Sequence, residues 1–333
     1  MRKARPLIYG PVPSRRLGLS LGVDLVPSKT CDYDCVYCQL GRTTNLTTRR
    51  SPYIPARAVL EELERRLETG IRPDYITMAG TGEPTLNTEL ASVISGVRKL
   101  TEIPVAVITN GSLLGDSDVQ AACLEADLVL PSLDAGDEDT FRAVNRPCAG
   151  LELAPVVEGL VDFRSKYRGK IWLEIMLLDG LNSSDESVEE IRRLIGRTVP
   201  DEVHLNTVRR PPVEPFARRV SPGRLEQIRS VLEPAAMVLD PAPRREPPAA
   251  GGDVEDRELL ALIERGPCTR RQIADLFGIN EIEALKRLSG LMESNLVVSE
   301  QSGGEVFYRA LPTASGSHYT VDPFEHKGGR SDG

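Results

Sequence analysis

Strand-like and helix-like stretches alternate along the chain from about residue 18 to residue 233, and this alternation limits the fold more than any other feature. It predicts an α/β domain in which parallel strands are joined by helical crossovers. The six expected strands are 19–26, 74–78, 104–109, 126–132, 170–178 and 201–207. The expected helices are 56–70, 88–100, 116–125, 138–145, 151–166, 185–196 and 222–232.

Six strand–helix units in roughly 215 residues is the usual size of a barrel-like domain. We therefore expect a partial (β/α)6 barrel as the catalytic domain, over residues 1–240. In such folds the chemistry lies in the loops after the carboxyl ends of the strands, where helix N-termini and free backbone N–H groups gather.

The remainder of the chain differs in character. Residues 241–253 contain four prolines and two glycines without periodicity, which predicts a semi-rigid linker. Three helical stretches and a hairpin with its tip at Gly303–Gly304 follow, and they predict a small winged-helix domain over residues 254–310. Residues 311–333, rich in Gly, Ser and Thr, predict a disordered tail.

The composition is that of a globular protein, with 40% hydrophobic and 27% charged residues. No apolar run approaches the roughly 20 residues needed to cross a bilayer, and the basic N-terminus lacks the apolar segment of a secretory signal. We therefore expect a cytoplasmic protein without membrane contact. The net charge is −8, but the first 50 residues carry nine basic and three acidic side chains. That basic segment suits an anionic substrate or a negatively charged cluster, or is simply a solvated surface.

Three of the six cysteines, Cys31, Cys35 and Cys38, lie within eight residues directly after the first expected strand. Thiolates at this spacing can point at one centre and are soft ligands for an iron–sulfur cluster or zinc. Structural zinc normally takes a fourth Cys or His at a typical spacing, and of the three histidines His204 alone could approach in space. A four-iron cluster with three local cysteines keeps one iron open. Both metals remain alternatives on spacing alone.

The motif Cys31-x-x-x-Cys35-x-Tyr37-Cys38 resembles the defining motif of the radical S-adenosylmethionine (SAM) superfamily, including the aromatic residue before the last cysteine. GTGEP (80–84) is similar to the family's glycine-rich motif after the second strand, with Thr81 where many members have glycine. Four further segments resemble the group that contains the tRNA wyosine-synthesising enzymes. They are residues 9–27, 108–111, 131–147 and 205–212. Those enzymes carry further cysteines upstream of the cluster motif, and none precedes Cys31 here, which favours a different reaction.

The resemblance implies a [4Fe–4S] cluster on the three cysteines, with SAM chelating the open iron. An electron from a low-potential flavodoxin- or ferredoxin-type donor would cleave SAM, and the 5′-deoxyadenosyl radical would abstract hydrogen from substrate. The expected SAM contacts are Tyr37, Gly80, Gly82, Glu83, Asn110, Ser132 and Asp134. Alternative roles are a plain turn for the glycines and Asn110 and a helix cap for Asp134. Glu174 either faces the barrel interior or faces a helix.

Five arginines, Arg15, Arg16, Arg146, Arg209 and Arg210, lie near expected strand ends or loops. Arginine suits bidentate binding of phosphate or carboxylate, so RNA or another anionic substrate is one expectation and ordinary surface arginines are the other. Residues 253–310 carry seven basic and eleven acidic side chains. The expected winged helix therefore contacts either protein or nucleic acid.

Three functions are compatible with these features. The first is a radical SAM enzyme, for which no catalytic side chain can be named. The second is an iron–sulfur redox sensor whose winged helix binds DNA, although GTGEP and the six strands argue against it. The third is a zinc-stabilised binding protein.

Overall fold

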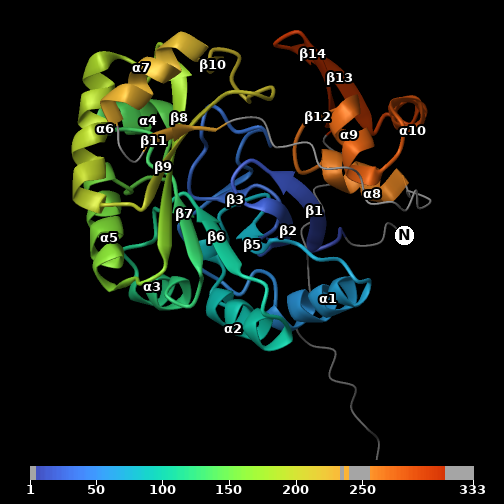
Figure 1. The fold of residues 1–333 in the computed structure, drawn as a ribbon, viewed down its shortest axis with the longest axis horizontal. Helices are drawn as coiled ribbons and strands as arrows, with labels where there is room; N and C mark the ends of the chain where they lie inside the picture. Colours follow the sequence, from blue (N-terminus) through green and yellow to red (C-terminus); the bar gives the residue numbers. More distant parts are fainter. Residues whose placement is uncertain (1–4, 233–235, 240–255, 312–333) are drawn as a thin grey trace, which may run out of the picture.

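The computed structural model describes residues 5–232, 236–239 and 256–311 of the chain (Figure 1). The expected linker (241–253) and the expected tail beyond residue 311 lie outside the described residues. Within the described part, strands and helices alternate as the sequence predicts.

One large sheet has the order β1-β2-β5-β6-β7-β8-β9-β11, and β10 pairs with β8. The strands that correspond to the six expected ones are β2 (Gly18–Asp24), β5 (Tyr75–Ala79), β6 (Val105–Thr109), β7 (Leu128–Pro131), β8 (Lys170–Asp179) and β9 (Glu202–Thr207). Three further strands are β1 (Ile8–Ser14), β10 (Arg218–Arg219) and β11 (Ala236–Val238). A short separate ladder joins β3 (Thr30–Cys31) to β4 (Asn45–Leu46).

Neighbouring strands from β2 to β11 run parallel, whereas β1 and β10 are antiparallel to their partners. The expectation that the strands pair only in parallel is therefore wrong at β1 and at β10. Strand β1 contains Pro11 and Pro13, which hide it from sequence patterns because proline lacks an N–H for the ladder. An edge strand tolerates proline, and β1 lies at the edge.

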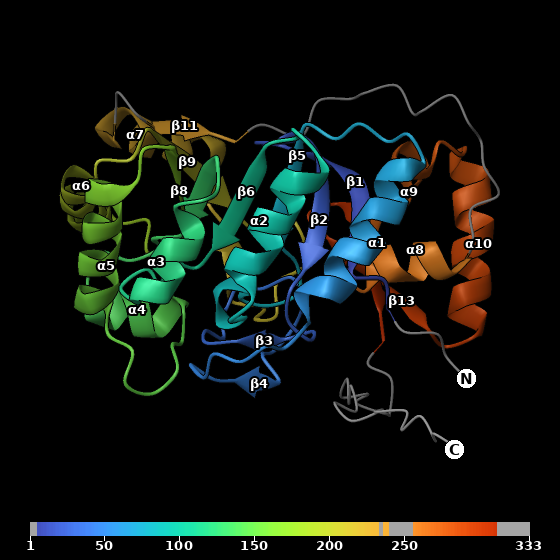
Figure 2. The same ribbon diagram turned by 90° about the horizontal axis from the view of Figure 1, so that it is seen from below.

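Seven α-helices follow strands of this sheet and pack against its outer face (Figure 2). They are α1 (Ala56–Glu68), α2 (Leu90–Leu100), α3 (Ser117–Cys123), α4 (Glu138–Val144), α5 (Leu153–Lys166), α6 (Asp185–Thr198) and α7 (Pro222–Leu232), with a 3-10 turn η1 (Pro84–Leu86). Local chemistry sets their ends: the Ser184 hydroxyl accepts the N–H of Ser187 at the start of α6. Helix α1 buries Ala56, Val59 and Leu63, one side of its cylinder.

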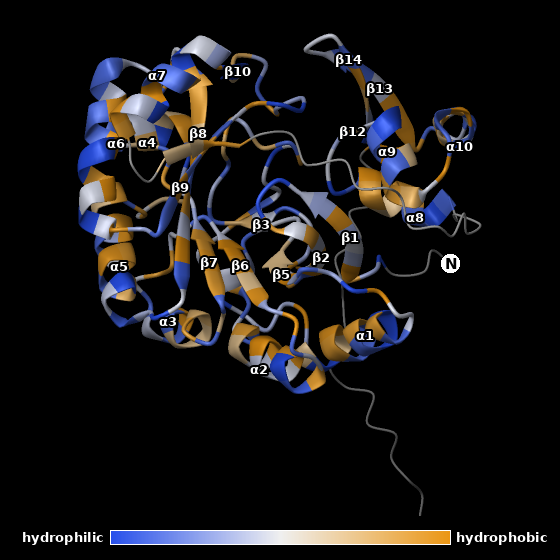
Figure 3. Ribbon diagram, viewed as in Figure 1, coloured by the Kyte–Doolittle hydropathy of each residue, from blue (hydrophilic) through white to orange (hydrophobic). Residues whose placement is uncertain are grey.

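The main hydrophobic core lies between the sheet and these helices. Strands β5 to β8 are coloured mainly hydrophobic in Figure 3, while the outer helices show hydrophilic residues on their exposed sides. Because parallel strands are covered by helices, their side chains on the helix side are apolar. The other side of the sheet faces the barrel interior, where the polar residues described below collect.

Residues 256–311 form a smaller unit, which we call the C-terminal module. It contains α8 (Asp256–Ile263), α9 (Arg270–Phe277) and α10 (Glu281–Glu293), with an antiparallel sheet ordered β12-β14-β13. The strands are β12 (Cys268–Thr269), β13 (Val297–Ser302) and β14 (Glu305–Ala310). The module has its own core and lies on the β1 side of the large sheet (Figures 1 and 2). The three helices and the hairpin are confirmed; their identity as a winged helix remains a prediction.

None of the helices within residues 5–232, 236–239 and 256–311 has the length and apolar character needed to cross a membrane.

Candidate active site

The cysteine loop follows β2 and lies at the carboxyl end of the parallel strands, as expected. Cys31 ends β3, and Cys35 and Cys38 lie in a turn closed by the Cys38 N–H donating to the Cys35 carbonyl at 3.1 Å. All three are free thiols and half-buried.

Each of the three sulfurs lies beside an N–H donor from a different part of the chain. The pairs are Lys29 Nζ with Cys38 Sγ at 3.2 Å, Asn145 Nδ2 with Cys35 Sγ at 3.6 Å, and Asn110 Nδ2 with Cys31 Sγ at 3.9 Å. Donors of this kind stabilise sulfur that carries negative charge, as it does when it binds a metal. The donor set therefore fits an iron–sulfur cluster.

Burial raises the pKa of the Cys31 and Cys35 thiols, and the neighbouring carboxylates Asp32 and Asp134 raise them further. Because a metal binds the thiolate form, these raised pKa values mean that metal binding must release the thiol protons. Among the described residues, no three Cys, His, Asp or Glu side chains are arranged around a single metal ion.

The GTGEP loop follows β5 and packs tightly on the segments around it. Gly80 has a φ of +122°, and a Cβ there would lie 1.9 Å from Asp24 Oδ1. A Cβ on Gly82 would lie 2.0 Å from the Thr30 carbonyl oxygen. Both positions therefore require glycine for close approach of the backbone.

Backbone hydrogen bonds join this loop to the cysteine loop. The Lys29 N–H donates to the Thr81 carbonyl at 2.6 Å, and the Glu83 N–H donates to the Thr30 carbonyl at 3.0 Å. The structure thus brings together the two motifs that the sequence places about 45 residues apart.

The Glu83 carboxylate is buried and already has four protein donors. They are the Thr85 N–H at 3.1 Å, the Thr85 hydroxyl at 2.6 Å, the Thr109 hydroxyl at 2.7 Å and the Asn110 N–H at 2.8 Å. Burial, and next the charge of Asp32, raise the pKa of Glu83 to about 7. Its side chain thus fixes η1 and the end of β6, while its contact with SAM stays a prediction.

Asn110 lies at the centre of this part of the site. Its amide donates to Asp32 Oδ1 at 2.5 Å, and the Ser112 hydroxyl donates to Asp32 Oδ2. Asp32 is fully buried, and burial raises its pKa against these hydrogen bonds. Asn110 was an expected site residue, whereas Asp32 and Ser112 were not. Asp32 lies between two cysteines and Ser112 directly follows an Asn-Gly turn, and these positions are the sequence signals that could have indicated them.

A third buried carboxylate, Asp134, links the cysteine loop to the fourth and fifth expected strands. Its Oδ2 accepts from the Tyr37 hydroxyl at 2.5 Å and from Asn145 Nδ2 at 2.7 Å, and its Oδ1 accepts from the Met176 N–H at 2.8 Å. The predicted site residues Tyr37 and Asp134 are therefore direct partners. Asn145, which also reaches Cys35, was missed because it ends a helix far along the chain.

Ser132 forms a parallel bridge with Glu174, beside Asp134. Glu174 faces polar groups, because it forms an ion pair with Arg16 and accepts from Asn206 Nδ2 at 2.8 Å. Its carboxylate therefore already has two partners, and a contact of Glu174 with a ligand stays a prediction.

The five arginines divide between two places. Arg15 donates to Asn206 Oδ1 at 2.9 Å, and the charges of Arg209 and Arg210 act on it. Burial and those two charges lower the pKa of Arg15 to about 10. Arg146 instead pairs with Glu214 at 2.6 Å near the cysteine loop.

A surface hollow of about 510 Å³ lies outside the barrel, between the segment after β6 and helix α5. Ser112, which contacts Asp32, is its one link to the site residues above. Three of its carboxylates, Asp116, Glu158 and Asp162, are already paired with Arg50, Arg197 and Lys166. We therefore do not place the active site there.

The radical SAM superfamily model matches residues 25–195. A protein named GTPase Obg from Brachyspira hyodysenteriae is 36% identical over 303 residues, which are 90% of this chain and 45% of that protein. The chain thus spans less than half the length of that relative. A UPF0026 protein from Methanocaldococcus jannaschii is 38% identical over 228 residues, which are 68% of this chain and 70% of that protein.

A radical SAM methyltransferase from Sphaerobacter thermophilus has a similar fold, with a TM-score of 0.50 and 20% identity over 66% of this chain and 65% of that one. The match supports the partial barrel as the fold of the large domain. The family match and the two motifs that the structure brings together lead to one conclusion. The chain is a radical SAM enzyme and belongs, within the radical SAM superfamily, to the UPF0026 family.

Proposed function

We propose that the enzyme uses a [4Fe–4S] cluster on Cys31, Cys35 and Cys38 to cleave SAM reductively and to abstract hydrogen from an anionic substrate. The observation that carries this proposal is the set of three sulfurs, each beside its own N–H donor. When bound, the cluster supplies the electron that cleaves SAM, which a low-potential flavodoxin- or ferredoxin-type donor replaces.

The chain's own residues would then bind and orient the reactants. The backbone of Gly80 to Gly82 offers close approach, and the network of Asn110, Asp32 and Ser112 fixes one wall beside Cys31. Asp134 holds the Tyr37 ring beside Cys35. These contacts keep the cysteine loop in one geometry, so that the cluster is held without reorganisation.

The arginine group supports an anionic substrate. Arg16 is neutralised by Glu174, but among the described residues neither Arg15 nor Arg210 is hydrogen-bonded to a carboxylate. Half-buried positive charges without a counter-charge raise the local potential for an anion, and arginine binds phosphate or carboxylate through paired N–H groups. Phosphate of RNA and phosphate of a small molecule share this chemistry.

The C-terminal module gives less support to nucleic-acid binding. Arg270, Arg271, Arg287 and Arg309 each lie within 4.0 Å of a carboxylate of the module. A protein that binds DNA normally presents uncompensated Lys and Arg to the phosphates. These ion pairs favour a structural or protein-contact role for the module over the redox-sensing DNA-binding regulator.

The proposal is tested by anaerobic reconstitution with iron and sulfide, followed by reduction and assay for 5′-deoxyadenosine from SAM. We expect cleavage by the wild type and none by Cys38→Ala, with Cys148→Ala as the matched control that retains activity. One bound zinc per chain with no SAM cleavage contradicts the proposal.

The substrate class is tested separately, by comparing modified tRNA nucleosides and phosphate-bearing metabolites in cells with and without the gene. A change in the tRNA nucleosides identifies RNA, and a change among the metabolites identifies a small anion. A change confined to uncharged metabolites contradicts the anionic substrate.

A further inference from the structure

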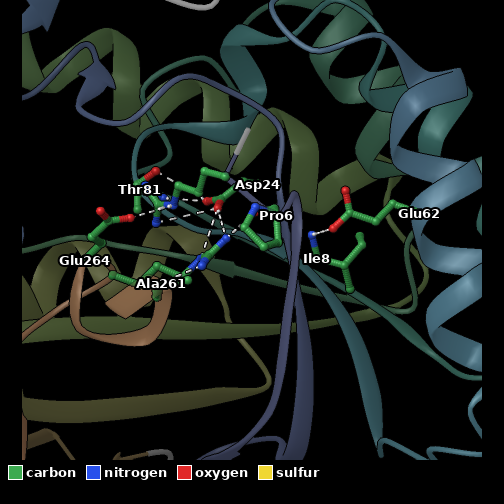
Figure 4. Close-up of polar contacts among 9 residues, drawn as sticks. Pro6, Ile8, Asp24, Glu62, Thr81, Ala261 and Glu264 are labelled. Atoms are coloured by element: carbon green, nitrogen blue, oxygen red, sulfur yellow. Dashed lines mark hydrogen bonds and ion pairs between the residues drawn. The ribbon is translucent and has the colours of Figure 1, made fainter. Parts of the chain in front are cut away.

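The carboxylate of Asp24, the last residue of β2, is shared between the GTGEP loop and the C-terminal module. Figure 4 shows Asp24 close to Thr81 and also close to Ala261 and Glu264 of the module. Asp24 is 4% exposed, so its charge must be balanced by protein groups.

The two oxygens of Asp24 have different partners. Oδ1 accepts from the Thr81 N–H at 3.0 Å and packs against Gly80, where no side chain would fit. Oδ2 accepts from Arg265 Nε at 3.1 Å and from Arg265 Nη2 at 2.8 Å. Through Oδ1 the Asp24 carboxylate fixes the GTGEP loop. Through Oδ2 it depends on the two hydrogen bonds from Arg265 of the module, with Arg5 Nη2 at 3.8 Å as a second, more distant cation.

Arg265 is held in a single position by further contacts. Its Nη1 donates to the Ala261 carbonyl at 2.9 Å, its Nη2 donates to the Pro6 carbonyl, and its guanidinium lies 4.4 Å from the centre of the Tyr9 ring. The side chain is 6% exposed. A planar guanidinium with this many partners orients a carboxylate far better than a mobile surface charge does.

The next residue, Gly266, brings the same turn of the module to the cysteine loop. A Cβ built there would lie 3.1 Å from Arg210 Nη1 and 3.3 Å from Gln39, the residue after Cys38. Gly266 has a φ of +148°, which disfavours any side chain. The turn 265–266 thus lies against Asp24, against Gln39 and against Arg210, one of the five arginines described above.

We infer that Arg265 is a positioning residue for the SAM-binding loop: by holding Asp24, it sets the backbone of Gly80 and Thr81, so that the C-terminal module completes the SAM site. The inference rests on the proposed function for the identity of the ligand. The link from Arg265 through Asp24 to Thr81 is a property of the protein without cofactor, and it can be measured without one.

The first test is amide hydrogen exchange of the full-length protein without cofactor. Thr81 reports directly, because its N–H is the donor to Asp24, whereas the Glu83 N–H bonds to Thr30 and serves as an internal reference. In Arg265→Gln we expect exchange at Thr81 to rise at least tenfold relative to Glu83. Arg271→Ala, a change in an exposed pair of the same module, is the matched control and leaves the ratio unchanged.

The second measurement is the SAM dissociation constant of the reconstituted protein, by equilibrium dialysis. Arg265→Gln is expected to weaken binding at least tenfold with wild-type iron content, while Arg271→Ala binds as the wild type does. Wild-type exchange at Thr81 together with wild-type affinity in Arg265→Gln overturns the inference, as does a uniform rise in exchange throughout the barrel.

If Arg265→Gln does not fold, the same exchange measurement is made on Arg265→Lys, because lysine keeps the charge but loses the planar pair of donors. Exchange raised at Thr81 alone supports the inference, and wild-type exchange at Thr81 contradicts it. If the wild type itself neither binds nor cleaves SAM, the proposed function fails, whereas the exchange result still decides the link between module and loop.

Discussion

Two groups of buried charge line the barrel interior, and they differ in how they are balanced. Near the cysteine loop, the carboxylates Asp32, Glu83 and Asp134 accept hydrogen bonds from uncharged donors. In the second group, Arg15 and Arg16 are cations, and only Arg16 has a hydrogen-bonded or ion-paired carboxylate among the described residues.

The difference separates residues that maintain the structure of the site from residues that can bind an anionic ligand. A buried carboxylate with several donors is part of a rigid network, since each lost bond leaves an unsatisfied polar group. A half-buried arginine without a carboxylate gains more from an anionic ligand than from the protein. Removing members of the first group should therefore damage folding, and removing unpaired members of the second should damage binding.

The largest expected effect is that of Asp134→Ala. The substitution leaves the Tyr37 hydroxyl, the Asn145 amide and the Met176 N–H without their acceptor, and should lower the free energy of unfolding by about 4 kcal/mol. Urea denaturation of the protein without cofactor measures it. Asp134→Asn, which keeps one acceptor oxygen, is the control and should lose clearly less. Equal losses in the two variants would contradict the network.

The next effect sharpens the comparison within the arginines. Arg16→Gln leaves the Glu174 carboxylate without its ion-pair partner and should cost about 3 kcal/mol of stability. Arg15→Gln removes the neighbouring cation, which has no carboxylate partner, and serves as the matched control in the same denaturation experiment. A loss for Arg15→Gln as large as that for Arg16→Gln would remove the distinction between paired and unpaired arginines.

Glu83 gives the third effect, a dependence of stability on pH. Its pKa rises from 4.5 in the unfolded chain to about 7 in the folded protein, chiefly through burial. The folded state therefore holds the proton more tightly, and its contribution to stability is full below pH 4.5 and is lost as the pH rises through 7. The expected loss between pH 5 and pH 7 is about 2 kcal/mol.

Denaturation of the wild type and of Glu83→Gln at a series of pH values tests this expectation. The difference between the two proteins should shrink or reverse across this range, because the variant cannot titrate. A difference that stays constant from pH 5 to pH 7 would show that Glu83 has an ordinary pKa.

The smallest effect on stability, and the most specific for binding, concerns Arg15. Arg15→Gln should change the unfolding free energy by less than about 0.5 kcal/mol, since it also relieves repulsion from Arg209 and Arg210. Tripolyphosphate should raise the melting temperature of the wild type and not that of the variant, and high salt should weaken the effect. An equal rise in both proteins would place anion binding elsewhere.

The local part of this architecture follows from the sequence. The strands β2 and β5 to β9 have apolar runs long enough to recognise, and three cysteines in eight residues predict a metal-binding loop. Strand β1 could not be predicted, because Gly10, Pro11 and Pro13 indicate a turn, and only its position at the sheet edge makes it a strand.

The site residues likewise divide into those that local sequence indicates and those that it does not. Asn110 and Asp134 stand at strand ends and were recognisable by position. Asn145 was not, because its contacts with Cys35 and Asp134 depend on where α4 ends in space. The pair of Asp24 and Arg265 spans 241 residues, and no local pattern indicates it.

That separation also has a consequence for biosynthesis. At about 5–20 residues per second, residue 265 leaves the ribosome roughly 10 to 50 s after Asp24. Throughout that interval Asp24 lacks its two hydrogen bonds from Arg265, although Thr81 and Arg5, whose Nη2 lies 3.8 Å from Asp24 Oδ2, have already been made. The nascent barrel thus holds Asp24 beneath its glycine-rich loop without the paired donors of Arg265, and translation of the module's first helix and the turn after it supplies them.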